Sequence, residues 1–183
     1  MDIRHLGLRS VVVVAAAGVL LGGSLAYATV VGHAPLATWS HAAGTSINVV
    51  KVVRDSNIRN TSSTTYKSLP GASVTIKIPA GSKGLIIARF SGTSECTEPS
   101  NTTGGYGCQV RVLIGGQEAQ PTGINASIFD SSSTDGREAH AIERSRGPLG
   151  PGTYQVVAQW AVPSATVDFT LANWNLEVDL VKA

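Results

Sequence analysis

The sequence predicts an all-β fold, a single antiparallel β-sandwich, preceded by an N-terminal signal-peptide helix. Two patterns near the C-terminus predict the sandwich. Every second residue from 154 to 160 is apolar or aromatic, and apolar residues alternate again from 167 to 180. A period of two is typical of strands that bury one face. The alternation changes phase at Ala172–Asn173, which predicts a bulge or tight turn there, because otherwise half of these apolar side chains would face solvent.

The composition agrees with short strands joined by turns. Only 14 % of the 183 residues are charged, and 20 are glycine. The 14 basic and 12 acidic side chains nearly balance. This balance gives no electrostatic reason to expect nucleic acid or an anionic membrane surface as a partner.

The N-terminal residues predict export. Arg4 and Arg9 precede an apolar run at 11–21, and Ala26–Tyr27–Ala28 forms a site with small residues at both ends. This order is that of a secretory signal peptide over residues 1–28, cleaved near Ala28 to release a secreted protein. The alternative is a membrane anchor formed by residues 10–31, which is close to the length that a spanning helix needs. Residues 29–45 have no periodicity and are expected to be a flexible leader, and residues 46–183 form the sandwich domain.

The first half of the domain alternates between strand and turn patterns. Residues 47–53 are a β-branched run, and a polar turn region follows at 55–63. The expected elements after it are, in order, a short strand at 64–69 ended by Pro70–Gly71, a half-buried strand at 74–78, a turn at 79–82 and a central strand at 85–90.

The second half continues in the same way. Residues 109–114 alternate, and Gly115–Gly116 predicts a two-residue hairpin turn before a short return strand at 117–120. Residues 123–136 read as a loop. Residues 138–145 are expected to be a strand, although their composition also permits a short helix. About eight to ten short strands with turns between them are typical of a sandwich or barrel.

Cys96 and Cys108 are the only cysteines. An even number in an exported protein favours a disulfide. We expect it to close the neck of a hairpin between the strand at 85–90 and the strand at 109–114, with a stabilisation of about 3 kcal/mol on the chain-entropy model.

No motif predicts an enzyme or a cofactor. The chain has no Gly-x-Ser-x-Gly elbow, no His-Glu-x-x-His and no glycine-rich phosphate loop. The chain contains the residue types of a Ser-His-Asp triad, since it has many serines as well as His33, His41 and His140, so such a triad stays open. A small extracellular hydrolase built on His140 is therefore the alternative to a non-catalytic protein.

Three groups of residues are candidate contact sites: a loop with two aspartates, a charged stretch of strand and a set of aromatic side chains. Asp130 and Asp135 lie in an oxygen-rich loop that is either a weak calcium site or a solvated loop. In the charged stretch 137–146, Glu138, His140 and Arg144 share one face of the expected strand. His140 beside carboxylates is a candidate functional pair, and the alternative is that these charged residues form cross-strand ion pairs on a sheet surface.

Aromatic side chains suggest a sugar-binding surface, because their faces can stack on pyranose rings. Trp160 and Trp174 lie on the apolar faces of their strands, so we expect them in the core. Tyr106 and Trp39 are the two expected to be exposed.

Several segments together resemble uncharacterised exported proteins of actinomycete type. They are residues 64–71, 74–79, 85–90, 110–116, 143–146 and 150–154. This resemblance implies a β-sandwich and export, and no activity. Residues 151–154 before a strand, with the closing segment 169–176, are similar to the jelly roll of the C1q and tumour-necrosis-factor class. That resemblance implies a jelly-roll sandwich that trimerises and binds partners through its surface.

The expected function is therefore that of an exported, non-catalytic module for binding or for the cell surface. Its expected partner is a glycan or a protein at the cell surface.

Overall fold

The computed structural model describes residues 47–97, 107–131 and 136–182, which form ten strands and one short helix. The expected signal peptide and leader lie outside these residues. The elements are β1 (Ile47–Asp55), β2 (Arg59–Thr61), β3 (Lys67–Ile78), β4 (Gly84–Thr97), β5 (Cys108–Ile114), β6 (Gln117–Glu118), α1 (Ile124–Ser127), β7 (Ile128–Asp130), β8 (Glu138–Leu149), β9 (Gly152–Ala161) and β10 (Asp168–Lys182).

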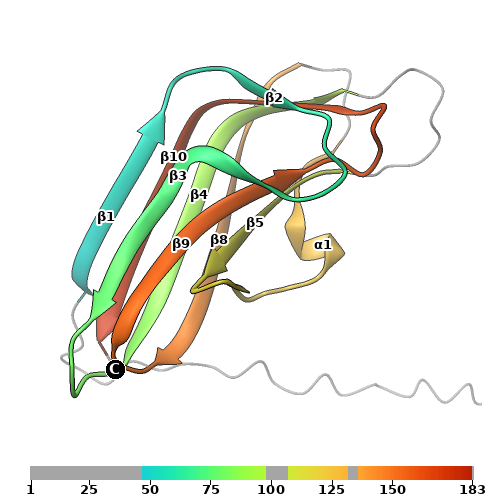
Figure 1. Cartoon of the computed structure of the whole chain (residues 1–183). Coiled ribbons are helices and arrows are strands. Elements are labelled where there is room, and N and C mark those ends of the chain that lie inside the picture. The colour runs from blue at the N-terminus through green and yellow to red at the C-terminus, as the bar shows by residue number, and fades with distance from the viewer. Residues whose placement is uncertain (1–46, 98–106, 132–135, 183) are drawn as a thin grey trace, which may run out of the picture. The chain divides into compact units, whose positions relative to one another are not determined.

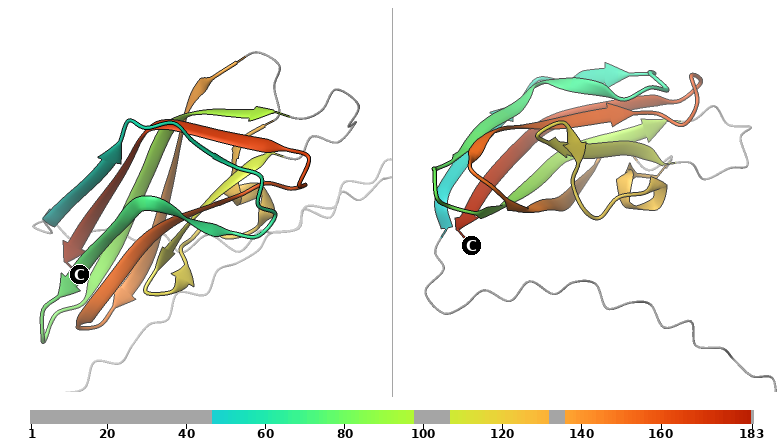
Figure 2. Two further views of the ribbon diagram at one scale, coloured as in Figure 1. Left: turned by 45° about the horizontal axis from the view of Figure 1, so that its top comes forward. Right: turned by 60° about the horizontal axis from the view of Figure 1, so that its bottom comes forward.

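The strands form two antiparallel sheets, which confirms the predicted sandwich (Figure 1). Sheet A has the order β1-β10-β4-β8, and β2 also pairs with β10. Sheet B has the order β3-β9-β5-β6, and β7 also pairs with β5. The two further views show the sheets as two layers, and α1 contacts β5 (Figure 2).

The core lies between the two sheets and uses the apolar faces that the alternation predicted. Trp174 is 1 % exposed, and the centre of its ring lies 6.3 Å from that of Phe90. Both residues belong to sheet A. Trp160 of sheet B is 5 % exposed and lies 5.7 Å from Phe169 of the facing sheet. The prediction that both tryptophans belong to the core is confirmed. Among the described residues, the core cluster runs from Leu69 to Leu180.

The phase change in the last strand is a bulge, as predicted. The register between β10 and β4 shifts between Ala172 and Asn175, and Asn173 has a φ of 50°. An asparagine tolerates this left-handed conformation better than most residues. The bulge keeps both halves of β10 facing the core.

The prediction that Pro70–Gly71 ends a strand is wrong. Residues 67–78 form one strand, β3, with a register shift between Ser68 and Ser73 and a φ of 82° at Gly71. β3 pairs only with β9 and is therefore an edge strand. Proline is tolerated there, because an edge strand does not need every backbone N–H for pairing.

Three other expectations have mixed outcomes. The hairpin turn at Gly115–Gly116 is confirmed, with φ values of 58° and 77°. The strand at 138–145 is also confirmed, and it extends to Leu149. The loop at 123–136 instead contains α1 and β7, whose Phe129 is 4 % exposed. Elements this short do not show a period in the sequence.

The disulfide between Cys96 and Cys108 is confirmed, with 5.8 Å between the Cα atoms. The expected hairpin is wrong, because β4 belongs to sheet A and β5 to sheet B. The bond therefore joins the two layers of the sandwich. Spacing along the chain cannot reveal this, because a connection of this length can cross between sheets as well as turn within one.

Candidate functional site

The outer face of sheet B carries a linked group of polar side chains around Tyr66. The Tyr66 hydroxyl donates to Oε1 of Gln109 at 2.6 Å. The guanidinium carbon of Arg111 lies 3.9 Å from the centre of the tyrosine ring. A guanidinium at this distance from an aromatic face is held by a cation–π interaction. We call Tyr66, Gln109, Arg111, Glu118 and Gln159 the Tyr66 platform.

The strand register explains why these residues meet. Arg111 of β5 lies opposite Gln159 of β9, which in turn lies opposite Ser68 of β3. Arg111 donates through Nε to Oε1 of Gln159 at 2.9 Å and lies 3.3 Å from Oε2 of Glu118. Each side chain of the platform is thus fixed by at least one neighbour.

A hollow of about 270 Å³ adjoins the platform. Its lining combines polar groups of Tyr66, Gln109 and Glu118 with Ile124 of α1, which is 69 % exposed. Binding sites for small ligands are concave and combine apolar surface with a few oriented polar groups. The aromatic ring, amides, guanidinium and carboxylate can together recognise a ligand that is rich in hydroxyl groups.

His140 lies near two carboxylates but bonds to neither. Its Nε2 is 3.8 Å from Oδ1 of Asp130 and 3.7 Å from Oε2 of Glu138, which is too long for a hydrogen bond. The nearby Ser94 hydroxyl is buried and donates to Oδ2 of Asp130 at 2.7 Å. In a catalytic triad the serine is hydrogen-bonded to the histidine. In this structure Ser94 donates to the acid instead.

The calcium hypothesis involves Asp130 and Asp135. Asp130 is 6 % exposed and accepts from Ser94, and Asp135 lies outside the described residues. Within residues 47–97, 107–131 and 136–182, no three His, Cys, Asp or Glu side chains are grouped so that they could hold a metal ion.

Arg144 is buried, so its interpretation as part of the surface ion pairs is wrong. Its side chain donates to the backbone oxygen of Glu143 at 2.7 Å and to that of Ala126. Burial lowers the pKa of its guanidinium, and the nearby Glu118 opposes that shift. β8 lies at one edge of sheet A, and the guanidinium of Arg144 there satisfies carbonyl groups.

The Tyr66 platform was not among the candidates from the sequence. Tyr106 and Trp39, which were, lie outside the described residues. In the sequence, the platform is marked by the polar residues that alternate with apolar ones in the strands at 109–114 and 154–160. This alternation did not identify a site, because only the strand order brings residues 66, 111 and 159 together.

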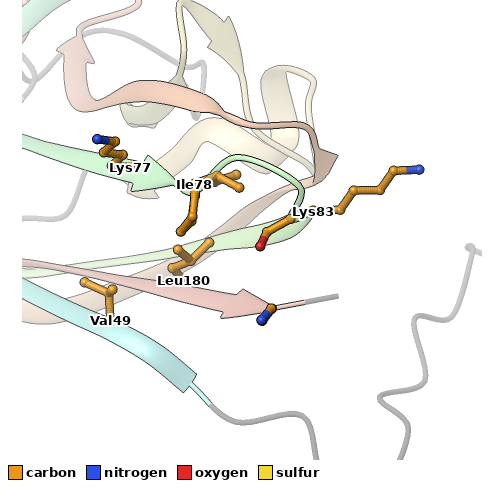
Figure 3. A pocket seen from close by; sticks show the side chains of 8 residues that line it. Val49, Lys77, Ile78, Lys83 and Leu180 are labelled. Atoms are coloured by element: carbon orange, nitrogen blue, oxygen red, sulfur yellow. The ribbon is translucent and has the colours of Figure 1, made fainter.

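A second hollow, of about 170 Å³, lies at the end of the sandwich where β1 begins. Val49, Ile78 and Leu180 form its apolar part, and Lys77, Lys83 and Lys182 also line it. In Figure 3 the three apolar side chains lie together, whereas Lys77 and Lys83 extend to opposite sides.

No family model matches the chain, and no curated protein matches it. Within the part that the structure describes, no helix has the length and apolar character to cross a membrane.

Proposed function

We propose that the chain is an exported, non-catalytic β-sandwich that binds a glycan or another hydroxyl-rich ligand at the Tyr66 platform. The observation that carries this proposal is the ring of Tyr66 with Arg111 and Gln109 fixed against it. The hollow beside the platform leaves room for a ligand. The disulfide is compatible with an oxidising extracellular location.

The proposed fold is a jelly roll. Its support is the nested pairing of the strands: β1 pairs with β10, β3 with β9, β4 with β8 and β5 with β7. A chain that pairs in this way is a long hairpin rolled into two sheets, which is the arrangement expected for a jelly roll.

A glycan array with the chain that begins at Thr29 tests the ligand. We expect Tyr66→Ala and Arg111→Ala each to lower the affinity for a bound glycan about tenfold or more, because stacking and charge-assisted hydrogen bonds are lost. Arg54→Ala is the matched control, since Arg54 is an exposed arginine on sheet A. Absence of any bound glycan, or equal losses in Arg111→Ala and Arg54→Ala, would contradict the proposal.

The proposed location is extracellular, after cleavage near Ala28. N-terminal sequencing of the protein from the culture medium should then begin at Thr29. Recovery of the chain in membranes with Met1 intact would support the anchor at residues 10–31 instead.

A further inference from the structure

The lysines of this chain differ from its arginines in where they lie and in whether they form ion pairs. The whole sequence has five lysines, and Lys77, Lys83 and Lys182 line a single hollow. Among the described residues, the basic partner in each ion pair is an arginine or His140, and none is a lysine. Within the described residues, the three lysines at the hollow thus have no acidic side chain as an ion-pair partner.

The strand register places these lysines at one end of the sandwich. Ile47 lies opposite Val181, and Gly84 lies opposite Lys182. The segments that meet here are the start of β1 (47–50), the last three residues of β10 (180–182), the loop at 79–83 and the turn at 150–151. None of them contains Asp or Glu, and the preceding residue of β10, Asp179, is paired with Arg89. We call this end, with Lys77, Lys83 and Lys182, the lysine tip.

The shape of the tip favours an extended anionic surface over a single small anion. Lys77 and Lys83 extend to opposite sides of the hollow (Figure 3), so their ammonium groups do not converge on one point. Among the apolar residues that line the hollow, Val49 is half-buried, whereas Ile78 and Leu180 are buried, at 2 % and 4 % exposed. Ile47, at the same end, is 54 % exposed. Cationic groups beside an exposed apolar side chain such as Ile47 are suited to the interface of a bilayer, where phosphates lie beside acyl chains.

We propose that the lysine tip docks on the surface of an anionic lipid bilayer. The ammonium groups of Lys77, Lys83 and Lys182 contact lipid phosphates, and Ile47 lies against the boundary with the acyl chains. Ile47 is the first residue of β1, so the preceding segment joins the sandwich at the tip, and docking would hold this junction at the membrane. Neither the Tyr66 platform nor a glycan enters this proposal.

The test uses the chain from Thr29, which contains all ten described strands, with vesicles in a sedimentation assay. We expect binding to phosphatidylcholine vesicles that contain about 30 % phosphatidylglycerol, with each lysine contributing about fivefold. The triple variant Lys77→Gln, Lys83→Gln, Lys182→Gln should therefore bind about 100-fold more weakly. Raising the salt well above about 0.1 M should also weaken binding of the unaltered chain.

Lys67→Gln is the matched control, because Lys67 is an exposed lysine on β3 outside the tip, and its binding should stay close to that of the unaltered chain. Circular dichroism checks that the variants fold. The proposal is overturned by equal binding to pure phosphatidylcholine vesicles, by no binding at all, or by a triple variant that binds as well as Lys67→Gln. Displacement of the protein by millimolar glycerol phosphate would also overturn it, since the tip would then hold a single free anion.

Discussion

Arg89 carries one positive charge among three carboxylates on the outer face of sheet A. Its Nη1 lies 2.6 Å from Oδ2 of Asp179 and 2.8 Å from Oε1 of Glu177, and its Nε lies 2.8 Å from Oε2 of Glu143. The hydrogen bond with Asp179 is the largest of the causes that raise the pKa of the guanidinium. Asp179 has a side chain that is 2 % exposed, so it depends on Arg89 far more than the two exposed glutamates do.

This difference predicts unequal effects of two substitutions. Arg89→Ala should lower the free energy of unfolding by about 2–3 kcal/mol, because it leaves the buried Asp179 carboxylate without its counter-charge. Asp179→Asn should cost less, since Arg89 keeps two carboxylate partners. Urea unfolding of both variants and of the double variant measures the coupling. If the two single losses were independent and simply added, Arg89 would not be acting through Asp179.

Individual residues also show how much of the core and of the candidate site the sequence could predict. Trp160 and Trp174 could be assigned to the core because each lies in an alternating run of its own strand. Tyr66 and Arg111 are separated by 45 positions along the chain, and their contact depends on which strands are neighbours. Local patterns predict the face on which a residue lies, but not the residue that faces it across the sheet.

Among the elements, strands with long alternating runs were predictable and strands at the edges were less so. β10 and its bulge follow directly from the change of phase at Ala172–Asn173. The sequence predicts a break in β3 at Pro70–Gly71, because these residues usually mark a turn. The strand continues through them because it lies at the edge of sheet B. β7 has three residues, which is too short for a period to be recognised.

Gly147 shows how closely β8 approaches β4. A Cβ at this position would lie 2.9 Å from the Cα of Leu85 and 3.0 Å from the backbone oxygen of Gly84. Because backbone atoms cannot move aside as a side chain can, Gly147→Ala should lower the free energy of unfolding by about 1–3 kcal/mol. Gly150→Ala is the control, since nothing lies within 4 Å of its added Cβ, and thermal unfolding compares the two. A similar loss in both variants would mean that the close approach at Gly147 is not the cause.

The molecule as a whole depends on how the two layers are joined. The strand character of the long alternating segments follows from the sequence, but the division of the strands between sheets does not, because the long strands share the same alternating pattern. The cysteines illustrate this point. Their pairing was predicted from their number, whereas the change of layer between β4 and β5 could be seen only in the strand order.

The disulfide joins the end of β4 in sheet A to the start of β5 in sheet B, and both cysteines are buried. The double substitution Cys96→Ala, Cys108→Ala should lower the free energy of unfolding by about 3 kcal/mol, because the unfolded chain regains the entropy of the open loop. Chemical unfolding of the oxidised protein and of the double variant measures this loss. Reduction of the unaltered chain should reproduce most of it, which separates the effect of the bond from that of the smaller side chains. Alkylation of two thiols in the exported protein without any reductant would show that the bond does not form, and the layers would then be held together by their core alone.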